Sequence, residues 1–154
     1  MEMSVLSDRH LDSVVDWQRA IDAEQFPLRL STDVQLAILR GFLPSLLRDR
    51  QTGFEHYRDN PEETRNVYSN IDFGRAWTCE VSFRWMGDLD ELEAAWMAAT
   101  AYALATEGIV FDPQDGRLYT PQEARQAVRD IQRERPALEA AMRELAAKFS
   151  PATR

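Results

Sequence analysis

The ten residues from Ala76 to Trp85 narrow the folds open to this chain more than any other segment. Apolar and polar residues alternate along it: Trp77, Cys79, Val81, Phe83 and Trp85 are separated by Thr78, Glu80, Ser82 and Arg84. Successive side chains of a β-strand point to opposite faces. The pattern therefore predicts a strand with one apolar and one polar face, which is typical of an antiparallel sheet that covers a core on one side.

A helix is predicted directly after this strand. Asp88 and Glu91 form an acidic N-terminal cap that complements the helix dipole. Gly108 supplies the C-terminal stop. Between them, apolar residues at helical spacing predict one buried stripe, made of Leu89, Leu92, Trp96, Ala99 and Ala103.

Further strands are expected on both sides of this unit. Residues 41–47 and 52–57 flank a charged turn and predict a hairpin, in which Phe54 and His56 share one face. Pro44 cannot donate to a strand ladder, so its strand is expected at a sheet edge or at a bulge. Residues 109–111 and 118–119 flank a tight turn at 112–116. Two short strands are also predicted, at 28–30 and at 3–6, the latter as an alternating or edge strand.

Capping signals place the remaining helices. Ser13 and Asp16 predict a capping box at the start of a helix that runs to about Glu24. Thr120–Glu123 combines an N-cap hydroxyl, a proline at the first position and a glutamate at the third, which is a strong helix start. Pro136 is expected to break or kink that helix, beyond which an amphipathic face continues to the C-terminus through Leu138, Met142, Leu145 and Phe149.

These elements predict one α+β domain over residues 1–154, with a mostly antiparallel sheet packed against two or three helices. The sequence contains no internal repeat, no low-complexity tract and no linker rich in Gly, Ser or Pro. A chain of 154 residues has the size of a single domain.

Composition argues against two classes of partner. Asp and Glu outnumber Lys and Arg by 26 to 18, for a net charge of −8, whereas a nucleic-acid-binding surface needs a basic face. Apolar runs fall short of the roughly 20 residues that cross a bilayer, and the N-terminus lacks the features of a signal peptide. The single cysteine, Cys79, cannot form an internal disulfide, so we expect a cytoplasmic protein.

Few residues suggest catalysis. Cys79 is predicted to be a buried, inert thiol, and His10 a solvated histidine. The two histidines and one cysteine show no metal-ligand spacing, and no glycine-rich phosphate loop occurs. We therefore predict no catalytic residue, no metal, no cofactor and no enzyme activity.

The negative charge, by contrast, is concentrated. Residues 88–116 carry seven acidic side chains and no Lys or Arg, and residues 59–72 carry four against Arg65 alone. One interpretation is a solvated surface that aids solubility. The other is a surface that steers and holds a basic protein. Under the second interpretation the predicted contact residues are Asp59, Glu62, Glu63, Asp88, Asp90 and Glu91, with Tyr68, Phe73 and Trp77 either as anchors or as core.

Several segments resemble a group of small uncharacterised proteobacterial proteins, some of which look like immunity proteins encoded beside polymorphic or type VI secreted toxins. The resemblance runs from about Ser13 to Ala124 and lies in residues 41–44, 52–55 and 108–116, with the alanine-rich helix before Gly108. It implies a cytoplasmic, non-enzymatic protein that binds a cognate toxin, which could be a nuclease, and blocks it.

Two alternatives stay open. The first is a small regulatory or scaffold domain that forms a homodimer through Leu138–Phe149. The second is an enzyme of unknown type, which would need a pocket lined by His56 with Glu55 or Glu80.

Overall fold

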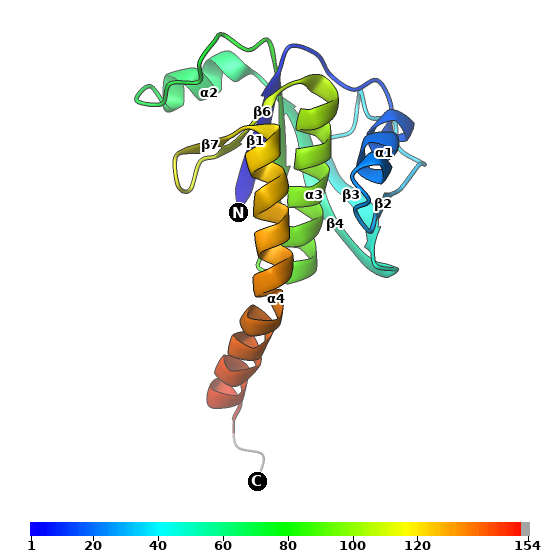
Figure 1. The fold of residues 1–154 in the computed structure, drawn as a ribbon, viewed down its shortest axis with the longest axis vertical. Helices are drawn as coiled ribbons and strands as arrows, with labels where there is room; N and C mark the ends of the chain where they lie inside the picture. Colours follow the sequence, from blue (N-terminus) through cyan, green and yellow to red (C-terminus); the bar gives the residue numbers. More distant parts are fainter. Residues whose placement is uncertain (152–154) are drawn as a thin grey trace.

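The computed structural model describes residues 1–151. Its seven strands form one sheet in the order β2-β3-β4-β5-β1-β6-β7, and every pairing is antiparallel (Figure 1). Along the chain the elements are β1 (Glu2–Ser7), α1 (Val14–Ala23), β2 (Leu28–Leu30), β3 (Gly41–Leu47), β4 (Arg50–Asp59), α2 (Pro61–Val67), β5 (Cys79–Arg84), α3 (Leu89–Thr106), β6 (Ile109–Asp112), β7 (Arg117–Tyr119) and α4 (Pro121–Phe149). The predicted α+β class with an antiparallel sheet is confirmed.

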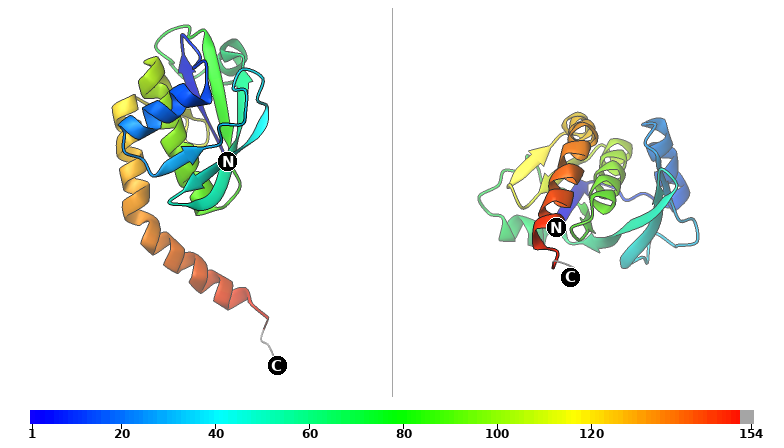
Figure 2. Two further views of the ribbon diagram at one scale, coloured as in Figure 1. Left: turned by 90° about the vertical axis from the view of Figure 1, so that its right-hand side faces the viewer. Right: turned by 90° about the horizontal axis from the view of Figure 1, so that it is seen from below.

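Helices α1, α3 and the first half of α4 cover one face of the sheet (Figures 1 and 2). The main core lies between these layers. At its centre Trp17 packs edge-to-face on Phe83 and Tyr102, with ring centroids 5.8 and 5.2 Å apart. Helix α3 is buried on nearly all sides because it has the sheet below it and a helix on each flank. Its short alanine side chains allow this close packing, so the predicted single stripe was too narrow.

A second, smaller core lies on the opposite face of the sheet. It consists of Leu6, Phe73, Trp77 and Phe111, and the segment between α2 and β5 covers it. The alternation predicted that Trp77 shares a face with Cys79, and this is wrong. Strand β5 begins only at Cys79, so Trp77 lies outside the strand and packs in the second core. Phe73 and Trp77 are core residues, whereas Tyr68 is half-buried at the border of this cluster. The remainder of this face, over β3, β4, β5 and the start of β1, is open.

Two expectations about sheet edges are wrong. Strand β1 lies inside the sheet between β5 and β6. Strand β3 also has a neighbour on each side, but β2 is so short that it pairs only as far as Ser45. The carbonyl of Pro44 accepts from the amide of Ser31 just beyond β2, so the ring nitrogen faces the same side, where no strand donor is needed.

The two helix starts identified from capping signals are present. The Ser13 hydroxyl accepts from the amide of Asp16, and Thr120 with Glu123 forms a reciprocal capping box. Helix α4 continues through Pro136, bends near it and then projects away from the sheet (Figure 2). Among the described residues, no helix is both long and apolar enough to cross a membrane.

Candidate functional site

The structure separates the six predicted contact residues into two groups at opposite ends of β4 and β5. Asp59 ends β4, and Glu62 and Glu63 lie in the first turn of α2, whose N-cap is Asn60. The other three residues, Asp88, Asp90 and Glu91, lie at the start of α3, beside the turn that joins β3 to β4. The six carboxylates thus do not form one compact patch.

The α3 group is largely engaged within the chain. Asp88 caps the helix by accepting from the amides of Asp90 and Glu91, and the Glu91 carboxylate accepts from the amide of Met86 at 2.9 Å. Asp90 is held by two arginines, with Arg50 Nε donating to its Oδ2 at 3.0 Å. The hydrogen bonds from Arg50 and then Arg135 lower the pKa of Asp90 to about 2.

Asp90 belongs to a network that joins α4 to α3 and to the β3–β4 turn. Glu93 is fully buried and accepts from Arg48 Nη1 at 3.1 Å and from Arg135 Nη1 at 2.6 Å. Burial opposes the ionisation of Glu93, yet these two hydrogen bonds keep its pKa below the usual range. We call this the arginine network; its members are Arg48, Arg50, Asp90, Glu93, Arg135 and Glu139. A large part of the negative charge at the start of α3 is therefore neutralised internally.

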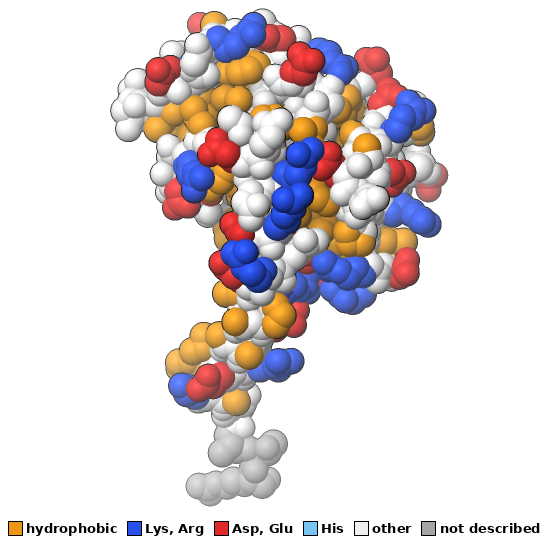
Figure 3. Space-filling view, in the orientation of Figure 1, with side chains coloured by type: hydrophobic (Ala, Val, Ile, Leu, Met, Phe, Trp, Pro, Cys, Tyr) orange, Lys and Arg blue, Asp and Glu red, His pale blue; other side chains and the backbone are white. Residues whose placement is uncertain are grey.

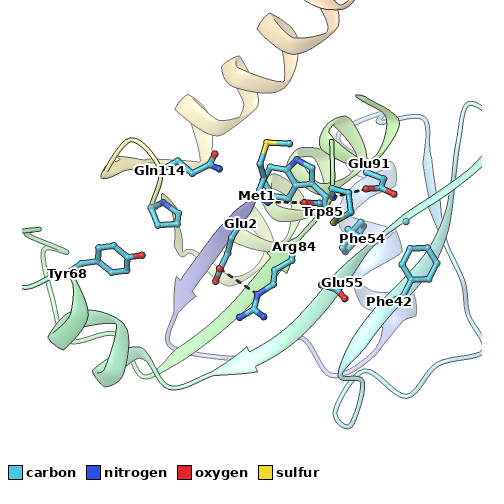
Figure 4. A pocket seen from close by; sticks show the side chains of 13 residues that line it. Met1, Glu2, Phe42, Phe54, Glu55, Tyr68, Arg84, Trp85, Glu91 and Gln114 are labelled. Atoms are coloured by element: carbon cyan, nitrogen blue, oxygen red, sulfur yellow. Dashed lines mark hydrogen bonds and ion pairs between the residues drawn. The ribbon is translucent and has the colours of Figure 1, made fainter. Parts of the chain in front are cut away.

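The open face of the sheet forms a groove with a different balance of charge (Figure 4). A hollow of about 670 Å³ lies over β4, β5 and β1, with Phe42 at one side and Tyr68 at the other. A second hollow of about 250 Å³ adjoins it beside α2 and shares Glu2, Tyr68, Arg84 and Pro113 with the first. We call the two hollows together the acidic groove.

Six carboxylates line the acidic groove: Glu2, Glu55, Asp59, Glu63, Glu80 and Glu91. Among its described lining residues, Arg84 is the only basic side chain. Arg84 lies between Glu55 and Glu2 on neighbouring strands, with its Nε 3.6 Å from Glu2 and its guanidinium 4.8 Å from the ring centre of Tyr57. The six carboxylates outnumber the Arg84 guanidinium and the amino-terminal ammonium of Met1, so the groove carries a net negative charge.

Glu80 is the most deeply buried carboxylate of the acidic groove. Its side chain is 98% buried, and Thr64 donates a hydrogen bond to it at 2.7 Å. Burial raises its pKa; hydrogen bonds from Thr64 and Ser4 partly oppose that rise, while nearby Asp59 and Glu2 add to it. Hydroxyl groups, not a cation, thus satisfy the only carboxylate that the groove buries fully.

Three predicted contact residues therefore line the acidic groove, Asp59 and Glu63 in the smaller hollow and Glu91 in the larger one, whereas Glu62, Asp88 and Asp90 do not line it. Sequence reasoning did not single out Glu2, and it named Glu55 and Glu80 only as possible neighbours of His56 in a catalytic pocket. Their signal was present, because the polar residues that alternate with core residues on β1, β4 and β5 must share the open face. The pairing of these strands, which no local pattern encodes, brings the three together.

His56 does not contribute to the groove. It is fully buried on the helix-covered face, where its ring lies 5.6 Å from that of Trp17, while Glu55 and Glu80 point to the opposite face. The site that would join His56 to Glu55 or Glu80 is therefore not formed. No group of three or more His, Cys, Asp or Glu side chains suited to a metal ion occurs within residues 1–151.

We compared the chain with protein-family models, with curated proteins and with solved structures, and none of the three comparisons found a match.

Proposed function

We propose that this chain is a binding protein whose acidic groove receives a basic segment of a partner protein, and that it acts in the cytoplasm as an immunity protein against a bacterial toxin. The observation that carries the binding proposal is the presence of six carboxylates against one arginine in the groove. Complementary charge steers such a partner and selects it over others.

Two further features support a basic protein segment as the occupant. Phe42 and Met86 line the groove and are 56% and 78% exposed, so apolar contacts are offered beside the charges. Glu80 is buried without a cationic partner, and an incoming lysine or arginine would supply one. A toxin as the partner is supported by the resemblance of residues 13–124 to small uncharacterised proteobacterial proteins, some of which look like immunity proteins. Many such toxins are nucleases with basic substrate clefts, which an acidic surface complements.

Binding of a fluorescent octa-arginine peptide tests the groove. Neutralising Asp59→Asn together with Glu63→Gln should raise the Kd at least about fivefold, because it removes charge at the contact. The matched control, Glu134→Gln with Glu144→Gln on exposed positions of α4, changes the net charge equally but should alter the Kd less than about twofold. Equal effects of the two pairs would show that only net charge matters and would overturn the groove assignment.

Neutralisation is tested separately, with the candidate toxin encoded beside the gene for this chain. Coexpression should restore the growth of cells that produce this toxin, and the groove variant should restore it less than the control variant does. A neighbouring gene that encodes no toxin, or a toxin whose effect persists, contradicts the immunity assignment. The peptide measurement is independent of that result.

A further inference from the structure

The second half of α4 presents an apolar stripe that nothing in the described chain covers. Leu138, Met142, Leu145 and Phe149 are 42–82% exposed, and every residue from 140 to 149 is exposed. Figure 3 shows hydrophobic side chains gathered along this projecting part. Their spacing of four, three and four residues continues the row of Ala124, Val128 and Ile131, which packs against the main core. The helix therefore keeps its buried-face pattern beyond the point at which it leaves the domain.

The residues of this projecting segment are arranged in mirror order about its centre, the bond between Arg143 and Glu144. Moving outward from this centre, each residue corresponds to one of matching or complementary character: Arg143 to Glu144, Met142 to Leu145, Ala141 to Ala146, Ala140 to Ala147, Glu139 to Lys148, Leu138 to Phe149, Ala137 to Ser150 and Pro136 to Pro151. Apolar residues correspond to apolar ones, small residues to small ones and each charge to the opposite charge.

We infer that two copies of this chain pair through this segment as antiparallel helices, with the two-fold axis at the mirror centre. In that arrangement corresponding residues lie at the same level along the pair, so Leu138 meets Phe149 of the second copy and Met142 meets its Leu145. These contacts form four successive apolar layers. Each layer is a knob-into-hole contact of the kind that an a/d stripe makes.

Charge favours the antiparallel pair over a parallel one. The positions that flank the stripe within the segment are Glu139, Ala141, Ala146 and Lys148. When the helices are antiparallel, Glu139 flanks Ala146 of the second copy and Lys148 flanks its Ala141, so like charges do not meet and the alanines allow close approach. A parallel pair would instead place Glu134 beside Glu139 of the second copy.

The same charges favour a second copy over a strongly charged partner. The segment carries Glu139, Arg143, Glu144 and Lys148, whose charges cancel. A strongly charged partner, such as the basic segment proposed for the acidic groove, would find no opposite net charge on this segment. The helix pair uses none of the groove residues, so the test of the pairing is independent of the test of the proposed function.

The mass of the full chain in solution, measured over a dilution series by sedimentation, tests the pairing. We expect a concentration-dependent dimer. Leu145→Glu should raise its dissociation constant by roughly 100-fold, because a charge replaces an apolar residue twice in the interface. The control Ala140→Glu lies on the outer side of the same helix and should leave the dimer intact. A monomer at every concentration, or a dimer that Leu145→Glu leaves unchanged, would overturn the inference.

Cross-linking in a Cys79→Ser background tests the direction. A mixture of Leu138→Cys and Phe149→Cys chains should form a disulfide-linked heterodimer, because these positions meet in the antiparallel pair. Leu138→Cys alone should not link to itself, since the two copies of this position would lie about 16 Å apart along the axis. Efficient self-linking of Leu138→Cys would show a parallel pair and contradict the proposed arrangement.

Discussion

Replacing Arg135 with methionine should lower the free energy of unfolding by about 3 kcal/mol, the lower end of the range for breaking a buried ion pair. Arg135 is 16% exposed and donates to Asp90, Glu93 and Glu139 from three different nitrogens. The substitution preserves the length and apolar stem of the side chain but leaves Glu93, which is fully buried, with Arg48 as its remaining partner. Glu93 then stays charged and buried with one cationic partner fewer, and this destabilises the folded state relative to the unfolded state. Urea unfolding followed by circular dichroism measures the change.

Arg129→Met is the matched control for that experiment. Arg129 lies on the same helix and is exposed, so its loss should change the free energy of unfolding by less than about 0.5 kcal/mol. Hydrogen exchange adds a local readout, because Arg135 fastens the middle of α4 to the start of α3. Arg135→Met should increase exchange in α4 before it does so in the sheet. Equal stability of the two variants would mean that the arginine network does not hold α4.

The arginine network also shows where sequence reasoning fell short. Residues 88–116 contain seven acidic side chains and no Lys or Arg, which predicts a concentration of negative charge there. Two of these carboxylates, Asp90 and Glu93, pair with Arg48 in the β3–β4 turn, with Arg50 at the start of β4 and with Arg135 on α4, each 40 or more positions away in the chain. Glu93 lies four residues after Leu89 and three before Trp96, so helical spacing places this carboxylate on the predicted apolar stripe. Only the packing of α4 on α3 explains its burial.

Local signals, by contrast, predicted most elements correctly. The Thr120 capping box, the hairpin around Arg48 and the alternation from Cys79 to Arg84 depend on residues close in sequence, and all three are present. Periodicity does not identify the short helix α2, because its seven residues are too few to define a helical pattern. Local signals do not determine the order of strands in the sheet. The acidic groove could therefore not be predicted, because it exists only where β4, β5 and β1 are neighbours.

Lowering the pH from about 7 to about 5 should reduce the free energy of unfolding by about 2 kcal/mol through His56 alone. Burial, followed by the charges of Arg58 and His10, lowers the pKa of His56 to about 4, against an ordinary value of 6.5. Below 6.5 the unfolded chain therefore takes up a proton that the folded chain does not bind until about pH 4. Unfolding is favoured as the pH falls through this window, and the stability is fully present only above it.

Substituting His56 with phenylalanine removes the titrating group and should flatten this part of the pH profile. The difference between wild type and variant isolates His56 from carboxylates that titrate nearby, such as Glu80, whose raised pKa acts in the opposite direction. Burial and then Arg58 also lower the pKa of His10, so this residue needs its own control. His10→Gln should retain most of the slope, because the fully buried His56 is still present in that variant. Urea unfolding of the three proteins at both pH values gives the comparison. A slope that persists in His56→Phe would show that groups other than His56 carry the pH dependence, and would contradict the prediction.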